Sequence, residues 1–204
     1  MYSTRPGLIL GFHGYDKSVA SKVLNGKADL NFSENTFDWL GHGIYFWEYS
    51  IERAYEYALS VSHRKHQNNN IKNPAVLGAV LDLGFCLDLV EYKNLHLLKN
   101  SFDFFKRTQI LSGYNLPKNK PGGSLTDLLL RDLDCAVIES LHQTRLEDGL
   151  KPYDSVKGVF LEGENLYPDA GFKEKNHVQI CIRNPNCIKG FFLPRELNDK
   201  YASV

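Results

Sequence analysis

The chain has 204 residues, of which 43% are hydrophobic and 24% are charged, with 24 basic and 24 acidic side chains. This composition excludes a disordered chain, because the apolar surface is large enough to offset the entropy cost of ordering the backbone. A net charge of zero excludes a global electrostatic attraction to nucleic acid or to an anionic membrane.

The length predicts a single domain over residues 1–204, and its first expected elements are a strand, a short helix and a second strand. An apolar run over 8–14 predicts the first strand. The helix follows over 19–24, with either Asp16 or Ser18 as its N-cap. Residues 41–47 predict the second strand, which two glycines open.

The clearest helix of the sequence is expected over 51–64. Ser50 precedes it as an N-cap, and apolar residues recur at helical spacing along one face. The later elements are expected, in chain order, as two strands, two helices and three strands: 76–81, 85–89, 95–111, 125–141, 158–162, 177–182 and 188–192. Strands near both ends with helices between them predict an α+β domain whose termini meet in one sheet.

Three short segments combine a glycine or a strand end with a polar side chain. They are Phe12-His13-Gly14, Gly43-Ile44-Tyr45-Phe46 and His177-Val178-Gln179. Glycine lets a ligand approach the backbone closely, and the two-residue period of a strand places His177 and Gln179 on one face. Each segment alone also has an ordinary structural explanation, as a strand-end histidine, a core tyrosine or an edge glutamine.

In this order the three segments resemble the ADP-ribosyltransferase fold, in the diphtheria-toxin and poly(ADP-ribose) polymerase branch with its His-Tyr-Glu signature. The resemblance spans about residues 8–60 and 158–193. It implies a split antiparallel β-sandwich with peripheral helices and an NAD cleft between the sheets. It also implies cleavage of NAD at the nicotinamide–ribose bond through a cationic sugar, which the site has to stabilise.

The resemblance also implies a role for each motif residue. His13 donates a hydrogen bond to the adenosine-side ribose, and the backbone of Gly14 pairs with the nicotinamide carboxamide. Tyr45 stacks on the nicotinamide ring, a contact worth about 0.5–1.5 kcal/mol beyond its burial. Gln179 accepts a hydrogen bond from the 2′-hydroxyl of the nicotinamide ribose.

Two departures from the family pattern bear on the activity. Gln179 stands where the family usually has Glu, which argues for transfer of a single ADP-ribose and leaves an inactive enzyme as an alternative. Glu56 stands where a second stacking Tyr is often found, so Tyr55 or Tyr57 is expected to take that role. His177 is a candidate base for the acceptor, with a surface histidine as the alternative.

Other carboxylates lie near the motifs, at Glu48, Glu162 and Glu164, and are expected to be solvated side chains. The four cysteines lack C-x-x-C spacing, so we expect free thiols and no metal site. With neither a signal peptide nor an apolar run of about 18 residues, the sequence favours a cytoplasmic protein without a membrane segment.

The function expected from these features is that of a mono-ADP-ribosyltransferase, which uses NAD as substrate and modifies a macromolecular acceptor, either protein or nucleic acid. Small proteins of this kind resemble toxins of toxin–antitoxin or phage-defence systems, so an antitoxin protein is an expected partner. NAD hydrolysis, 2′-phosphotransfer and a catalytically silent ADP-ribose- or partner-binding module are the alternatives.

Overall fold

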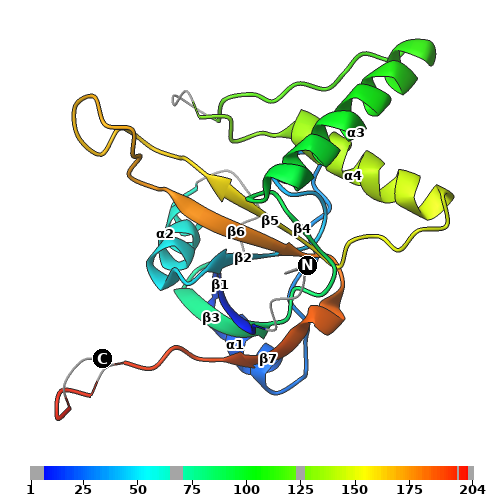
Figure 1. Ribbon diagram of the computed structural model, residues 1–204. Helices are drawn as coiled ribbons and strands as arrows, with labels where there is room; N and C mark the ends of the chain where they lie inside the picture. The colour runs from blue at the N-terminus through cyan, green and yellow to red at the C-terminus, as the bar shows by residue number, and fades with distance from the viewer. Residues whose placement is uncertain (1–6, 65–70, 123–126, 197, 202–204) are drawn as a thin grey trace.

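The computed structural model describes residues 7–64, 71–122, 127–196 and 198–201. Seven strands form one sheet in the order β4-β5-β6-β2-β1-β3-β7 (Figure 1). The strands are β1 (Ile9–Asp16), β2 (Ile44–Glu48), β3 (Pro74–Leu81), β4 (Cys86–Asp88), β5 (Ser155–Phe160), β6 (His177–Ile182) and β7 (Ile188–Phe192). The helices are α1 (Lys17–Leu24), α2 (Ile51–Ser62), α3 (Tyr92–Leu111) and α4 (Asp132–Glu147), with a 3₁₀ turn at Pro185–Cys187.

The α+β class expected from the sequence is confirmed, with two differences in the sheet. Hydrogen bonds link all seven strands into one sheet, where two separate sheets were expected. The β4–β5 pair is parallel, and the other neighbouring strands pair antiparallel. A parallel pair needs a long crossover connection, and α3 and α4 lie in the segment that joins β4 to β5.

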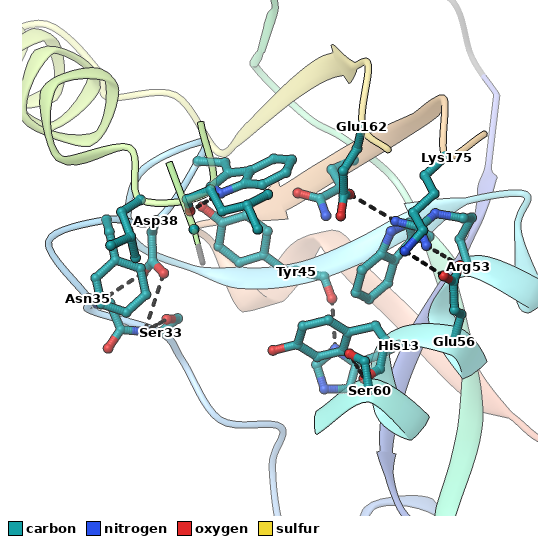
Figure 2. Close-up of a pocket in the computed structure, with 18 of the residues that line it drawn as sticks. His13, Ser33, Asn35, Asp38, Tyr45, Arg53, Glu56, Ser60, Glu162 and Lys175 are labelled. Carbon is teal, nitrogen blue, oxygen red and sulfur yellow. Dashed lines mark hydrogen bonds and ion pairs between the residues drawn. The ribbon is translucent and has the colours of Figure 1, made fainter. Parts of the chain in front are cut away.

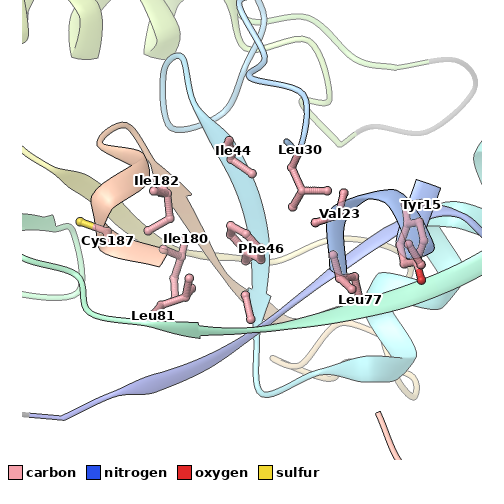
Figure 3. Packing of buried hydrophobic residues seen from close by; sticks show 12 residues of the cluster. Tyr15, Val23, Leu30, Ile44, Phe46, Leu77, Leu81, Ile180, Ile182 and Cys187 are labelled. Carbon is pink, nitrogen blue, oxygen red and sulfur yellow. The ribbon is translucent and has the colours of Figure 1, made fainter. Parts of the chain in front are cut away.

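The sheet folds over so that its two halves face each other across a buried apolar cluster (Figure 3). Phe46 of β2 and Ile180 of β6 pack with Leu77 and Leu81 of β3, although β3 is not their neighbour in the sheet. Gly11 lets the halves close, because a Cβ there would come within 2.6 Å of Leu81 Cδ1 and 2.9 Å of Phe46 Cβ. This cluster therefore lies between the halves that β1 and β2 join, and a second cluster packs α4 against β4, β5 and β6.

The expected N-caps are present at the first two helices. The Asp16 carboxylate accepts a hydrogen bond from the Ser18 amide at 2.9 Å, which decides between the two cap candidates for α1. Ser50 caps α2 by accepting from the Arg53 amide at 3.3 Å. Both caps satisfy amides that the first turn of a helix leaves without a partner.

The prediction of a helix over 125–141 was wrong at its start, since α4 begins at Asp132. Leu130 instead pairs with Lys120 in an isolated bridge. The Asn119 side chain then accepts from the amides of Leu133 and Asp134 at 2.9 and 3.2 Å and so caps α4. A cap supplied from 14 residues upstream leaves no local signal at the start of the helix.

Helices α3 and α4 pack against each other on the β4–β5 side of the sheet, while α2 packs on β1 and β3 (Figure 1). None of the helices in the described ranges is both long and apolar enough to span a membrane. The same residues contain no group of three or more His, Cys, Asp or Glu side chains placed to hold a metal ion. All four cysteines are free thiols.

Candidate functional site

A cavity of about 600 Å³ opens beside the point where β1 and β2 separate (Figure 2). Its wall combines residues from β1, β2, β6, α2 and the segment between α1 and β2. The side chains that line it include His13, Ser33, Asn35, Asp38, Trp39, Tyr45, Trp47, Arg53, Glu56, Tyr57, Ser60, Arg64, Glu162, Lys175 and Gln179. Residues from all three motif segments therefore meet at one cavity.

The ladder between β1 and β2 is short, and His13 marks its end. The strands pair only at Gly11–Glu48 and Phe12–Trp47. One step further, His13 Nδ1 lies 2.7 Å from the Tyr45 carbonyl oxygen. A carbonyl only accepts, so Nδ1 carries the hydrogen. Burial lowers the pKa of His13 and outweighs this hydrogen bond, which raises it, so the ring is neutral and Nε2 is an acceptor.

This geometry corrects the role expected for His13. The ring was expected to donate to a ribose hydroxyl, but its one hydrogen is already used on Tyr45. A ribose hydroxyl at the remaining ring nitrogen has to donate, and His13 accepts. The hydrogen bond from the imidazole to the Tyr45 carbonyl also replaces the next backbone hydrogen bond of the β1–β2 ladder, and it holds the two strands together where they separate.

Gly14 is buried and is not among the side chains that line the cavity. Helix α2 crosses it so closely that a Cβ on Gly14 would lie 2.1 Å from the Ala54 carbonyl oxygen. The Leu10 carbonyl accepts a hydrogen bond from the Tyr49 amide, so the backbone groups of Leu10 point to the β2 side of β1. The backbone groups of every second residue of a strand point to the same side, so the N–H and C=O of Gly14, four residues later, also point to the β2 side. Since the β1–β2 ladder stops at Phe12, β2 does not pair with these two groups.

Tyr45 presents its ring to the cavity and is held by its hydroxyl. The hydroxyl donates to the Gly41 carbonyl at 2.6 Å and accepts from the Leu40 amide at 2.8 Å. Burial raises the pKa of Tyr45, so the hydroxyl stays protonated and can donate. The ring is therefore fixed in orientation by the turn that precedes β2, and it remains available for stacking.

The structure separates the two tyrosines of α2 that were candidates for a second stacking ring. Tyr57 lines the cavity and packs on Trp47, with 5.0 Å between ring centroids. Tyr55 is 46% exposed and lies outside the cavity lining. The cavity face of α2 carries Arg53, Glu56, Tyr57 and Ser60, at the spacing of one helical face.

Gln179 lies at the cavity wall on β6, where it pairs in register with Trp47 of β2 and Gly158 of β5. The side chain is 8% exposed and has no hydrogen-bond partner within the described ranges. A neutral amide in this position offers one oxygen as acceptor and two hydrogens as donors. Gln179, Tyr45 and His13 therefore line the same cavity.

His177 is on the same strand but does not line the cavity. It packs among the rings of Trp39, Trp47 and Phe160, at centroid distances of 6.1, 6.5 and 5.7 Å. Its Nδ1 donates to the Lys175 carbonyl at 2.6 Å, and burial is the main cause that lowers its pKa to about 4. His177 is therefore not suited to act as the base for the acceptor, because its ring is buried and weakly basic.

An ion network of four side chains, Arg53, Glu56, Glu162 and Lys175, lines the same cavity as Gln179. Arg53 binds Glu56 of its own helix and also Glu162, with 3.0 Å between Arg53 Nη2 and Glu162 Oε2. Lys175 Nζ lies 2.8 Å from Glu56 Oε1. The i,i+3 spacing of Arg53 and Glu56 predicts that one pair. The other two contacts depend on how β5 and β6 bring Glu162 and Lys175 together.

A second polar group lies in the segment before β2. The Asp38 carboxylate accepts from the Asn35 amide at 3.0 Å and from the Asn35 side chain at 3.3 Å. Burial raises the pKa of Asp38 despite these bonds, and Trp39 next to it donates to the Leu129 carbonyl at 2.8 Å. These contacts hold the segment in the turn that places Tyr45.

Comparison with known proteins finds one similar chain without a described activity. An uncharacterized protein of Methanocaldococcus jannaschii is 25% identical over 197 residues, which cover 87% of this chain and 83% of that protein. No protein-family model and no solved structure matches the chain. The function is therefore argued from the geometry of the cavity.

Proposed function

We propose that this chain is a mono-ADP-ribosyltransferase with an ADP-ribosyltransferase-like split sandwich. It cleaves NAD at the nicotinamide–ribose bond and transfers one ADP-ribose to a macromolecular acceptor, protein or nucleic acid. The observation that carries the proposal is the meeting of His13, Tyr45 and Gln179 at one cavity, beside the point where β1 and β2 stop pairing. A cavity of about 600 Å³ is within the range of ligand sites.

The nicotinamide end of NAD is placed by backbone and ring groups. The N–H and C=O of Gly14 point to the side of β1 where the ladder with β2 has ended. A carboxamide complements such a pair, because it carries one acceptor and two donors. An amide left without a partner costs about 1–3 kcal/mol, so a carboxamide that pairs with Gly14 gains affinity and orientation. Tyr45 and Tyr57 supply aromatic faces on the cavity wall.

The ribose groups are recognised by neutral acceptors in this proposal. His13 Nε2 accepts from a hydroxyl of the adenosine-side ribose. The oxygen of the Gln179 amide accepts from the 2′-hydroxyl of the nicotinamide ribose, which becomes more acidic as the sugar turns cationic. A bond that strengthens as charge develops lowers the barrier more than it raises affinity.

Gln179 also supports the limit to a single transfer. A carboxylate at this position could accept the proton of an incoming ribose hydroxyl, which chain elongation requires, whereas an amide is not a base. The same substitution favours one rival function, a silent module that binds NAD or ADP-ribose without cleaving it. We also propose that the protein acts in the cytoplasm, where NAD is supplied, as a toxin whose activity an antitoxin protein blocks.

Release of nicotinamide from NAD tests the proposed function. The wild-type protein is incubated with NAD alone, and then with protein and RNA extracts as acceptors, and nicotinamide is quantified by chromatography. Transfer predicts nicotinamide release that rises with one class of acceptor, together with ADP-ribose bound to that class. Release that no acceptor increases identifies a hydrolase, and NAD binding without release identifies the silent module.

A further inference from the structure

Glu162 lies just beyond β5, at the edge of the cavity (Figure 2). The Lys175 amide donates to the Glu162 carbonyl at 2.9 Å, so the two residues face each other past the end of the β5–β6 ladder. The Glu162 side chain is 18% exposed and lines the same cavity as Gln179. It was expected to be a solvated carboxylate, and the fold instead places it at the site.

The two carboxylates of the ion network differ in how many oxygens they use. Glu56 uses both, because Oε2 binds Arg53 and Oε1 lies 2.8 Å from Lys175 Nζ. Glu162 binds Arg53 through Oε2 at 3.0 Å, and its Oε1 has no hydrogen-bond partner among the residues that the structure describes. Glu162 is thus held in orientation by one oxygen and can accept a proton on the other.

We infer that Glu162 Oε1 is the base that takes the proton from the nucleophile attacking the nicotinamide ribose. This inference rests on the proposed function and assigns to Glu162 the role that the sequence predicts for His177. The nucleophile X–H forms a bond from X to C1′ of the ribose, and the bond from C1′ to the nicotinamide nitrogen breaks. Its electron pair leaves with neutral nicotinamide, and the proton of X–H moves to Glu162.

The electrostatics around Glu162 suit this role. Burial raises the pKa of Glu162, Arg53 and Lys175 oppose the shift, and the negative charges of Asp127 and Glu56 add to it. A carboxylate with a raised pKa is a stronger base than an ordinary one. For Glu56, burial also raises the pKa, but the bonds to Lys175 and Arg53 outweigh it and lower the pKa.

Asp38, the third acidic side chain that lines the cavity, already uses its carboxylate in hydrogen bonds within the chain. Asp38 uses both carboxylate oxygens on Asn35, through the backbone amide and the side chain. A proton on either oxygen would compete with one of these two hydrogen bonds. Glu162 is therefore the carboxylate of this cavity with an oxygen available for a proton.

The test compares Glu162→Gln with Glu56→Gln, using water and methanol as nucleophiles and nicotinamide release as the readout. General base catalysis is worth about 10²–10⁴-fold in rate, so Glu162→Gln is expected to lose at least about 100-fold. The shift of melting temperature with NAD should remain. The rate of the wild type should fall at acid pH as Glu162 is protonated, and this fall should be absent in Glu162→Gln and kept in Glu56→Gln.

Chemical rescue separates a base from a structural carboxylate. In Glu162→Ala, added formate should restore part of the lost rate, because it fits the vacated space and accepts the proton. Full activity of Glu162→Gln, or an equal loss in Glu56→Gln without rescue by formate, overturns the inference. Failure of the wild type to release nicotinamide with any nucleophile overturns the proposed function itself, so the two failures are distinguishable.

Discussion

The hydroxyl of Tyr45 is predicted to stabilise the fold, while its ring serves the ligand. Tyr45→Phe keeps the ring and removes one oxygen. That oxygen donates to the Gly41 carbonyl at 2.6 Å and accepts from the Leu40 amide at 2.8 Å. Both residues are buried, so the variant leaves the Leu40 amide without a partner, and the Gly41 carbonyl keeps only the contact with the Cys181 thiol at 3.5 Å.

The expected loss follows from these two groups. Leaving the buried Leu40 amide unpaired costs about 1–3 kcal/mol, and the lost hydrogen bond at the Gly41 carbonyl adds about 1 kcal/mol, which gives a loss of about 2–4 kcal/mol in the free energy of unfolding. For a chain of this size, each kcal/mol lowers the melting temperature by roughly 2–4 °C. Tyr45→Phe should therefore melt roughly 4–16 °C below the wild type. NAD affinity per folded molecule should change little, since Phe stacks as Tyr does.

Thermal denaturation and calorimetric titration with NAD measure the two effects separately. Tyr57→Phe is the matched control, because the Tyr57 hydroxyl has no hydrogen bond to another residue in the described ranges and its removal should cost less than about 0.5 kcal/mol. A Tyr45→Phe protein as stable as this control would refute the role given to the hydroxyl. A large loss of NAD affinity at unchanged stability would show that the hydroxyl binds the ligand.

Three further predictions concern helix packing, turnover and pH. Gly14→Ala places a Cβ 2.1 Å from the Ala54 carbonyl and should lower the free energy of unfolding by about 1–3 kcal/mol in urea denaturation; an unchanged midpoint would contradict the close approach of α2. Gln179→Ala should lower nicotinamide release more than about tenfold with a smaller change in NAD affinity, and equal losses in both would contradict a role confined to the transition state. His142 is 2% exposed, and its pKa is lowered from 6.5 to about 4, mainly by burial. As the pH falls, the unfolded chain therefore takes up this proton before the folded chain does, and the free energy of unfolding falls between pH 6.5 and pH 4. His142→Phe should reduce that slope by up to about 1.4 kcal/mol per pH unit, and a slope equal to the wild type would contradict it.

Strands and caps with local signals could be predicted from the sequence. The bounds 177–182 and 188–192 agree with β6 and β7, and Ser50 caps α2 as expected. These elements carry their signal in alternation, in adjacent turn residues or in a hydroxyl at the start of a helical pattern. The start of α4 had no such signal, because its cap comes from Asn119.

The candidate site was predictable where its residues carry a local signal, in the strands of His13, Tyr45 and Gln179 and on the helix that carries Tyr57. His13, Tyr45 and Gln179 meet at the cavity because each lies in a strand whose neighbours are set by the sheet. Strand alternation placed His177 on the face of Gln179, but it could not indicate the ring of aromatic side chains that buries it. Glu162 was unpredictable, since its partner Arg53 is 109 residues away and only the folded chain joins them.

Direct titration with NAD tests the central claim, that the cavity beside the β1–β2 separation is an NAD site. Calorimetry should show saturable binding of one NAD per chain, and this binding should be lost in Tyr45→Ala. NAD at 100 times the dissociation constant should stabilise the fold by about 2.7 kcal/mol, which raises the melting temperature by roughly 5–11 °C. Absence of both the binding heat and the shift at millimolar NAD would contradict the account.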